Sequence, residues 1–176
     1  NVFRPADRME TIECWEHALK SSKTPSVLSL TRQNLEPIRK KYSNVNKCSL
    51  GAYEVFRTNK KIHLTIIASG SEVNLAIETS HKLAKEKVYS KVISMPCQDL
   101  FDSQSRTYKQ KILNETKMKI SIEAASTDSW KKYVGNEGLT FGIDTFGKSA
   151  PYKEIYKYFG LTAANIANKS KKLINR

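Results

Sequence analysis

Hydrophobic positions along the chain first follow a helical period and then form short continuous runs. The spacing within residues 8–20 predicts an amphipathic helix with one apolar stripe. The members of the stripe are Ile12, Trp15, Ala18 and Leu19. Pro25 ends this segment, and the apolar run 27–30 that follows is typical of a short strand covered on both faces.

Residues 34–50 form a polar, basic connector without clear periodicity, and after it strand and helix patterns alternate. We therefore place a domain boundary in this connector, which divides the chain into residues 1–45 and 46–176. The apolar runs that predict strands lie at residues 51–56, 62–69, 88–95, 118–124 and 139–143. Helical patterns lie between and after them, at residues 73–86, 104–113, 129–134, 151–159 and 163–173.

Strands that alternate with helices favour a mostly parallel sheet with helices on both faces. The predicted fold class is α/β: a three-layer α/β/α arrangement around a mostly parallel, mixed five-stranded sheet, preceded by a partial helix–strand piece. Ser71 and Thr162 precede helical patterns and are predicted N-caps. Gly160 is expected to break the chain between the last two helices.

The composition excludes several classes of protein. With 39% hydrophobic residues among 176, the chain can bury an ordinary core and differs from disordered sequences. No apolar run approaches the roughly 18 residues that a membrane span needs, so no membrane partner is expected. The chain begins at Asn1 without a basic or apolar leader, and we expect a signal peptide to be absent or already removed.

The chain is strongly basic, with 30 Lys and Arg against 17 Asp and Glu and a net charge of +13. Such an excess raises a nucleic-acid-binding domain as one hypothesis. However, 23 of the basic residues are Lys and only 7 are Arg, and they are scattered along the chain. Because base readout relies on bidentate Arg and stacking aromatics, we expect a solvated basic surface and no nucleic-acid partner.

Few motifs in the sequence carry chemistry. The three cysteines, Cys14, Cys48 and Cys97, are odd in number and show no CxxC or Cys/His spacing, so no zinc site is expected. Unpaired thiols fit a reducing compartment, and we expect a cytoplasmic location. The sequence also lacks a Walker phosphate loop and a GxSxG nucleophile elbow.

Arg32 is the residue that most favours ligand binding. It follows the apolar run 27–30 within the polar cluster 31–34, and ligands bind at the carboxyl ends of strands in open α/β sheets. Its planar guanidinium matches a phosphate or a carboxylate. From the residues alone, an anion site and a structural ion pair remain equal alternatives.

Six blocks of sequence together resemble a known family. They are residues 4–7 (Arg-Pro-Ala-Asp), 30–35 (Leu-Thr-Arg-Gln-Asn-Leu), 68–73 (Ala-Ser-Gly-Ser-Glu-Val), 92–96 (Val-Ile-Ser-Met-Pro), 141–151 (Phe-Gly-Ile-Asp-Thr-Phe-Gly-Lys-Ser-Ala-Pro) and 159–162 (Phe-Gly-Leu-Thr). In this order and spacing they resemble the C-terminal part of transketolases of the bacterial type, over essentially the whole chain. The second and fifth blocks are the most specific, whereas the glycine turn alone would not identify a family.

The resemblance implies an enzyme that transfers a two-carbon ketol unit between sugar phosphates in the pentose phosphate pathway. It also implies thiamine diphosphate, a divalent metal (Mg²⁺ or Ca²⁺) and a homodimer with active sites between its subunits. By this match, residues 1–45 are the tail of the pyrimidine-binding domain with its linker, and residues 46–176 are the C-terminal domain.

The resemblance assigns one site residue to the chain, Arg32, as the ligand of the substrate's terminal phosphate. Two neighbours depart from the family's pattern, since Thr31 stands where Ser is usual and Glu36, a competitor for the guanidinium, where Pro is common. The family's catalytic glutamate, metal ligands and proton-handling histidines lie before Asn1. No catalytic, cofactor-binding or metal-binding residue is therefore expected in the chain, which alone should be inactive.

Two alternatives stay open beside this interpretation. Dihydroxyacetone synthase, deoxyxylulose-phosphate synthase and the β subunits of 2-oxo acid dehydrogenases share the fold of the C-terminal domain. The block at residues 141–151 argues against the last two. The other alternative is a non-catalytic module for dimerisation or for binding a regulatory ligand.

Overall fold

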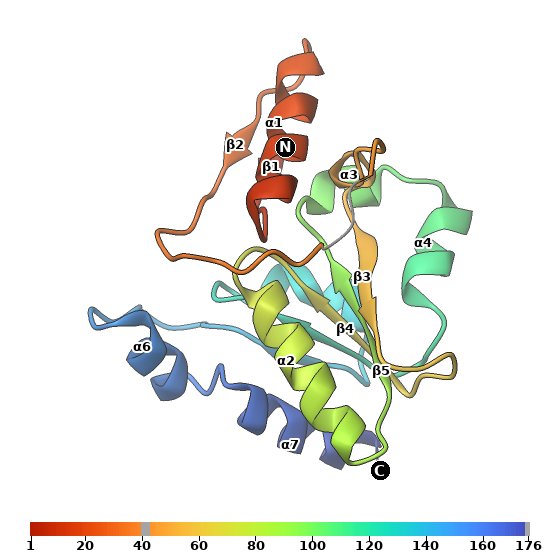
Figure 1. Ribbon diagram of the computed structural model, residues 1–176, viewed down its shortest axis with the longest axis vertical. Helices are drawn as coiled ribbons and strands as arrows, with labels where there is room; N and C mark the ends of the chain where they lie inside the picture. The colour runs from red at the N-terminus through yellow and green to blue at the C-terminus, as the bar shows by residue number, and fades with distance from the viewer. Residues whose placement is uncertain (40–42, 175–176) are drawn as a thin grey trace.

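The computed structural model describes residues 1–39 and 43–174, and its centre is a five-stranded sheet with helices on both faces (Figure 1). The strands are β3 (Tyr53–Arg57), β4 (Leu64–Ala68), β5 (Ser90–Ser94), β6 (Lys119–Ile122) and β7 (Leu139–Phe141). Their spatial order is β3-β5-β4-β6-β7, in which β3 is antiparallel to β5 and the other pairings are parallel. The predicted α/β fold class with a mixed five-stranded sheet is confirmed.

Helices cover both faces of this sheet because successive strand residues point to opposite sides. The helices are α2 (Glu72–Lys85), α3 (Gln98–Asp102), α4 (Arg106–Leu113), the 3-10 turn Asp128–Trp130, α5 (Lys131–Val134), α6 (Tyr152–Tyr158) and α7 (Ala163–Ile174). Leu64 and Ile66 of β4 pack in a core with residues of α2 and α7. Ile67 packs in a second core with residues of α3, α4 and α5.

A smaller unit precedes the sheet and consists of β1 (Val2–Phe3), α1 (Arg8–Lys20) and β2 (Val27–Leu28). β1 and β2 pair in parallel, so with α1 they make a βαβ arrangement beside the larger sheet (Figure 1). A short 3-10 helix, Cys48–Leu50, lies between this unit and β3. We call residues 1–30 the N-terminal unit.

Most predicted elements are confirmed to within a few residues, including the helix at 8–20 and all five strands of the large sheet. Thr162 Oγ1 accepts from the Asn165 N–H at 3.3 Å and so caps α7, as predicted. Gly160 has a φ of +72°, a left-handed conformation that ends α6. The pattern missed β1, which has only two residues, and α3, which begins two residues after Pro96.

Two local predictions are wrong. β2 ends at Leu28, pairs only with β1 among the described residues and leaves Val27 61% exposed, so it is not covered on both faces. Ser71 makes no capping hydrogen bond, because its hydroxyl donates instead to Glu72 Oε1 at 2.6 Å. The run 27–30 has only three apolar residues and was too short to establish burial. At Ser71, the neighbouring buried carboxylate of Glu72 competes for the hydroxyl.

The apolar stripe of α1 faces away from the large sheet. Ile12 and Leu19 are 59% and 79% exposed, whereas Glu10, Glu13 and Cys14 on the other side of the helix are buried. Helix α1 therefore packs on the larger unit through its acidic side, the reverse of the usual amphipathic arrangement.

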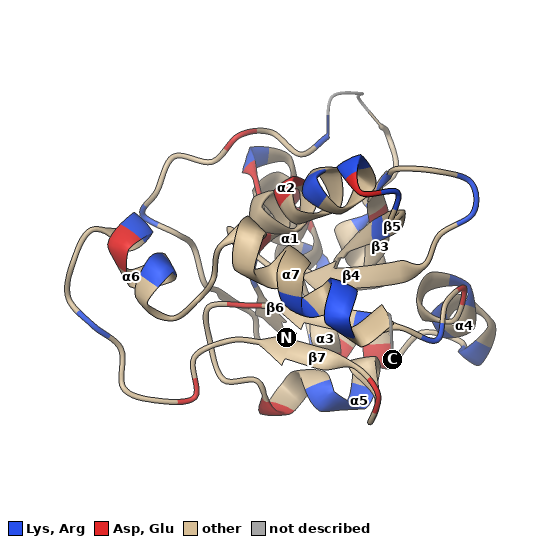
Figure 2. Cartoon of the chain, turned by 90° about the horizontal axis from the view of Figure 1, so that it is seen from below, with Lys and Arg blue, Asp and Glu red and all other residues tan. Residues whose placement is uncertain are grey.

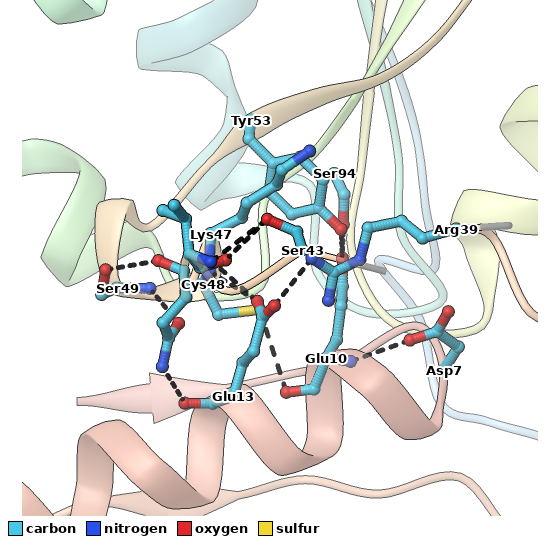
Figure 3. Close-up of polar contacts among 12 residues, drawn as sticks. Asp7, Glu10, Glu13, Arg39, Ser43, Lys47, Cys48, Ser49, Tyr53 and Ser94 are labelled. Atoms are coloured by element: carbon cyan, nitrogen blue, oxygen red, sulfur yellow. Dashed lines mark hydrogen bonds and ion pairs between the residues drawn. The ribbon is translucent and has the colours of Figure 1, made fainter. Parts of the chain in front are cut away.

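Glu10 is fully buried and accepts three hydrogen bonds (Figure 3). The hydroxyls of Tyr53 and Ser94 donate to its Oε1 at 2.7 and 2.6 Å, and the Ala6 N–H donates to its Oε2 at 2.7 Å. Asp7 caps the same helix by accepting from the Glu10 N–H at 2.8 Å. Because a buried carboxylate needs such donors, Glu10 ties the start of α1 to β3 and β5.

Glu13 makes a second buried attachment one helical turn further on (Figure 3). Its Oε2 accepts from the backbone N–H groups of Lys47 and Cys48, each at 3.0 Å. Its Oε1 pairs with Arg39 Nη1 at 2.7 Å, and both of these side chains are 8% exposed. This pair joins α1 to the chain that leads into the large sheet.

The three cysteines lie far apart in sequence but share one buried cluster with Phe3 and Tyr53. A hydrogen bond with Cys14, together with burial, raises the pKa of the Cys48 thiol, and burial raises the pKa of Cys97. Thiols held in the protonated form are poor nucleophiles and poor metal ligands. Among the described residues, no group of three or more His, Cys, Asp or Glu could hold a metal ion.

Lys and Arg residues are spread over several helices of the larger unit, including α2, α5, α6 and α7, with acidic residues among them (Figure 2). Some pair locally, as Lys131 Nζ does with Asp128 Oδ1 at 2.8 Å and Lys132 Nζ with Asp102 Oδ2 at 2.6 Å. Within residues 1–39 and 43–174, no helix has the length and apolar character needed to cross a membrane.

Replacing Glu10 by alanine should lower the free energy of unfolding by about 3 kcal/mol, because three buried donors lose their acceptor. Glutamine should lower it by only about 1 kcal/mol, since the amide oxygen can serve the Ala6 N–H while the hydroxyls reorient. Urea denaturation of the chain measures both values. Glu16→Gln, on the exposed side of α1, is the control and should change little. Equal losses for the two Glu10 variants would contradict this account.

The stability should also depend on pH through Glu10. Burial raises the pKa of its carboxyl, although hydrogen bonds from Ser94, Ala6 and Tyr53 act in the opposite direction. The folded state then keeps its proton to higher pH than the unfolded state. The free energy of unfolding should therefore fall as pH rises from the ordinary pKa of Glu through the raised value. Denaturation across this range should show a flatter profile for Glu10→Gln, and parallel profiles would refute the raised pKa.

Candidate functional site

Arg32 lies on the loop that follows β2, and its side chain is exposed. The Gln33 N–H donates to Thr31 Oγ1 at 3.2 Å, which holds the chain in a turn around Arg32. None of the ion pairs formed by the described residues includes Arg32, so neither a structural ion pair nor the expected competition from Glu36 is found there. Its exposed side chain is therefore accessible to an anion from solvent.

Two cavities adjoin this loop through the residues next to Arg32. One, of about 270 Å³, lies between Thr31, Asn34 and the start of α1, where Arg8 lines it. The other, of about 550 Å³, lies between residues 33–36 and the helices α2, α6 and α7. Arg32 itself lines neither of them, so its position fits an anion that approaches from the open surface.

A second polar arrangement lies at the carboxyl edge of the large sheet, where Arg4 meets two buried carboxylates. Arg4 follows β1, and its Nε lies 2.9 Å from Glu123 Oε1 while its Nη2 lies 3.4 Å from Glu72 Oε2. Glu72 is fully buried and Glu123 is 7% exposed. Glu72 begins α2 and Glu123 follows β6, so one arginine from the N-terminal unit bridges two elements of the larger unit.

Other side chains donate further hydrogen bonds to Glu72 and Glu123. Ser69 Oγ donates to Glu123 Oε1 at 2.7 Å, and Trp130 Nε1 donates to Glu123 Oε2 at 2.6 Å. The hydroxyl of Tyr156 donates to Glu72 Oε1. Burial and the nearby Glu72 carboxylate raise the pKa of Tyr156, which therefore stays a donor. Each of the two carboxylates is thus held by Arg4 and by at least one neutral donor.

Arg32 was predicted from the sequence as a site residue, whereas Arg4 was only part of a sequence block. A signal for the second arrangement was present, because Ser69 and Glu123 each directly follow a strand of the parallel sheet. The carboxyl ends of parallel strands meet at one edge, where such side chains converge. The partner could not be inferred from this signal, since Arg4 lies 68 residues before Glu72.

Comparison with known proteins gives a consistent family. A family model described as "Transketolase-like TK C-terminal domain" matches residues 51–162. A transketolase from Sinorhizobium medicae is 41% identical over 177 residues, covering 100% of this chain and 25% of that protein. The chain thus spans about a quarter of the length of the curated relatives it matches.

Solved structures agree with this assignment. Transketolase from Leishmania mexicana matches with a TM-score of 0.89 at 40% identity, over 99% of this chain and 25% of that one. Transketolase from Pichia stipitis, in complex with sedoheptulose-7-phosphate, matches with a TM-score of 0.88 at 35% identity over the same shares. Since the family model covers more than half of the residues, the chain belongs to the transketolase family and carries its C-terminal domain.

Proposed function

We propose that the chain contributes the C-terminal domain and one substrate-binding residue to a transketolase, which transfers a two-carbon ketol unit between sugar phosphates. Family membership supports the reaction class. The Pichia stipitis transketolase, in complex with sedoheptulose-7-phosphate, supports a phosphorylated sugar as the class of substrate. Within this chain, the observation that carries the proposal is the exposed guanidinium of Arg32 on the loop after β2.

Arg32 is suited to a phosphate because its guanidinium presents paired N–H donors in one plane. It has no ion pair with a described residue, so a phosphate would not have to displace an internal partner. In this proposal Arg32 binds the terminal phosphate and orients the sugar, and it takes no part in bond breaking.

Thiamine diphosphate and a divalent metal, Mg²⁺ or Ca²⁺, supply the carbanion-stabilising chemistry of a transketolase. The described residues do not fit this group. They contain no cluster of His, Cys, Asp or Glu that could hold a metal, and the carboxylates at the sheet edge are already paired with Arg4. We therefore assign the cofactor to other parts of the longer enzyme, and no step of its chemistry to these residues.

We further propose that residues 1–45 are part of a pyrimidine-binding domain and residues 46–176 form the C-terminal domain of a homodimeric, cytoplasmic enzyme. Exposed apolar side chains on the N-terminal unit support the first part, because such patches mark surfaces that other elements cover. They are Val2, Ile12, Trp15, Leu19, Val27 and Leu30. The three free cysteines support a reducing compartment.

In the complete enzyme, Arg32→Ala should raise KM for phosphorylated substrates far more than for an unphosphorylated ketose. Each charge-assisted hydrogen bond contributes about 1.5–3 kcal/mol, which gives a roughly tenfold to hundredfold loss in kcat/KM. Steady-state kinetics with the two kinds of substrate measures the difference.

Arg106→Ala, which removes an exposed arginine from the start of α4, is the matched control and should leave both kinetic constants unchanged. Arg32→Lys keeps the charge without the planar fork and should give an intermediate loss. If Arg32→Ala reduced kcat/KM equally for both kinds of substrate, phosphate binding by Arg32 would be excluded.

The proposal for residues 1–45 is tested by the solvent accessibility of Trp15 and Leu19. Hydroxyl-radical footprinting should label both side chains strongly in the 176-residue chain, where they are 50% and 79% exposed. In the complete enzyme both side chains should be protected. Phe146, which is also exposed in the 176-residue chain, is labelled in parallel as a reference, and no change in its exposure is predicted. Equal labelling of Trp15 and Leu19 in both proteins would refute the assignment.

A further inference from the structure

The carboxyl edge of the large sheet has the topology of a ligand site. From β4 the chain crosses to β5 on one side, and from β5 it crosses to β6 on the other, so β4 and β6 flank a switch point. Open α/β sheets bind ligands in the crevice beyond such strands. Ser69 and Glu123, which follow these two strands, line a cavity of about 390 Å³ at this edge.

The chain itself enters this crevice through Arg4, which also lines the cavity. The Arg4 N–H donates to the carbonyl of Pro96, beyond β5, at 2.8 Å, and the Arg4 carbonyl accepts from the Gly70 N–H, beyond β4, at 2.9 Å. Gly70 has a φ of +56°, and a Cβ there would lie 3.7 Å from the Arg4 side chain. With its guanidinium between Glu72 and Glu123, Arg4 is held by both backbone and side chain.

Arg4 is connected to the loop of Arg32 by short steps. It directly follows β1, whose Phe3 carbonyl accepts from the Ser29 N–H at 2.8 Å. Arg4 also lines a small cavity of about 120 Å³ together with Ser29, Thr31 and Tyr156. Since Tyr156 donates to Glu72, the acid that pairs with Arg4, the segment before Arg32 and this network face the same small cavity.

We infer that Arg4 is a positioning residue for Arg32: its ion pairs at the sheet edge fix β1, and β1 sets the place of the loop that presents the guanidinium. This inference rests on the proposed function of Arg32. A phosphate ligand must be placed accurately to orient the rest of the sugar, so a small shift of this loop should weaken phosphate recognition.

The test compares Arg4→Gln and Arg4→Lys with a matched control in the complete enzyme. Arg57 is the control, because it also bridges two carboxylates, those of Glu54 and Glu115, but on β3 at the other edge of the sheet. Arg4→Gln should raise KM for a phosphorylated ketose roughly tenfold, with little change for an unphosphorylated one. Arg4→Lys should recover part of the loss, and Arg57→Gln should affect neither substrate.

A double-mutant cycle separates this inference from the proposed function. If Arg4 acts through Arg32, then Arg4→Gln should cause no further rise in KM when Arg32 is already alanine. If Arg32→Ala shows no preference for phosphorylated substrates, the proposed function itself fails. If it does show the preference but Arg4→Gln lowers kcat/KM equally for both substrates, Arg4 is only structural and the inference is overturned. Should Arg4→Gln not fold, the same comparison with Arg4→Lys decides, because lysine keeps the charge but lacks the planar, forked guanidinium.

Discussion

The guanidinium of Arg4 between the carboxylates of Glu72 and Glu123 joins the end of β1 to two elements of the larger unit, and the place of the loop after β2 follows from it. Both acids belong to the larger unit and are buried, and a buried carboxylate is costly without an opposite charge or hydrogen-bond donors. Arg4 supplies the cation from the end of β1. These two ion pairs hold the end of β1 at the carboxyl edge of the sheet.

Buried acids of the N-terminal unit also bind donors that lie outside this unit. Glu10 and Glu13 belong to α1 and accept hydrogen bonds from donors outside the N-terminal unit, among them Tyr53 and Arg39 (Figure 3). The contact between the units therefore combines a buried apolar cluster, which includes Phe3 and Tyr53, with directional polar bonds that help to set the orientation of α1. The apolar side of α1, with Ile12, Trp15 and Leu19, takes no part in this contact and is exposed.

The large sheet could be predicted from the sequence because buried parallel strands such as β4 are continuous apolar runs bounded by turns. The packing of α1 could not be predicted, because a glutamate on a helix is expected to be exposed. Glu10 is buried only because Tyr53 and Ser94, which lie 43 and 84 residues away in the sequence, donate to it in the folded chain. Residue type and local position made Arg32 a candidate anion site, and its role stays a prediction. The role of Arg4 depends on partners that only the folded chain brings together.

Native-state hydrogen exchange of the chain tests most directly whether these polar contacts join the two units into one cooperative structure. The account predicts that the slowest amides of α1 and of β4 exchange through the same opening, with opening free energies within about 1 kcal/mol of each other. The opposite result would be α1 amides that exchange several kcal/mol more easily while β4 stays protected. That outcome would mean that the buried acids and Arg4 do not hold the N-terminal unit in place.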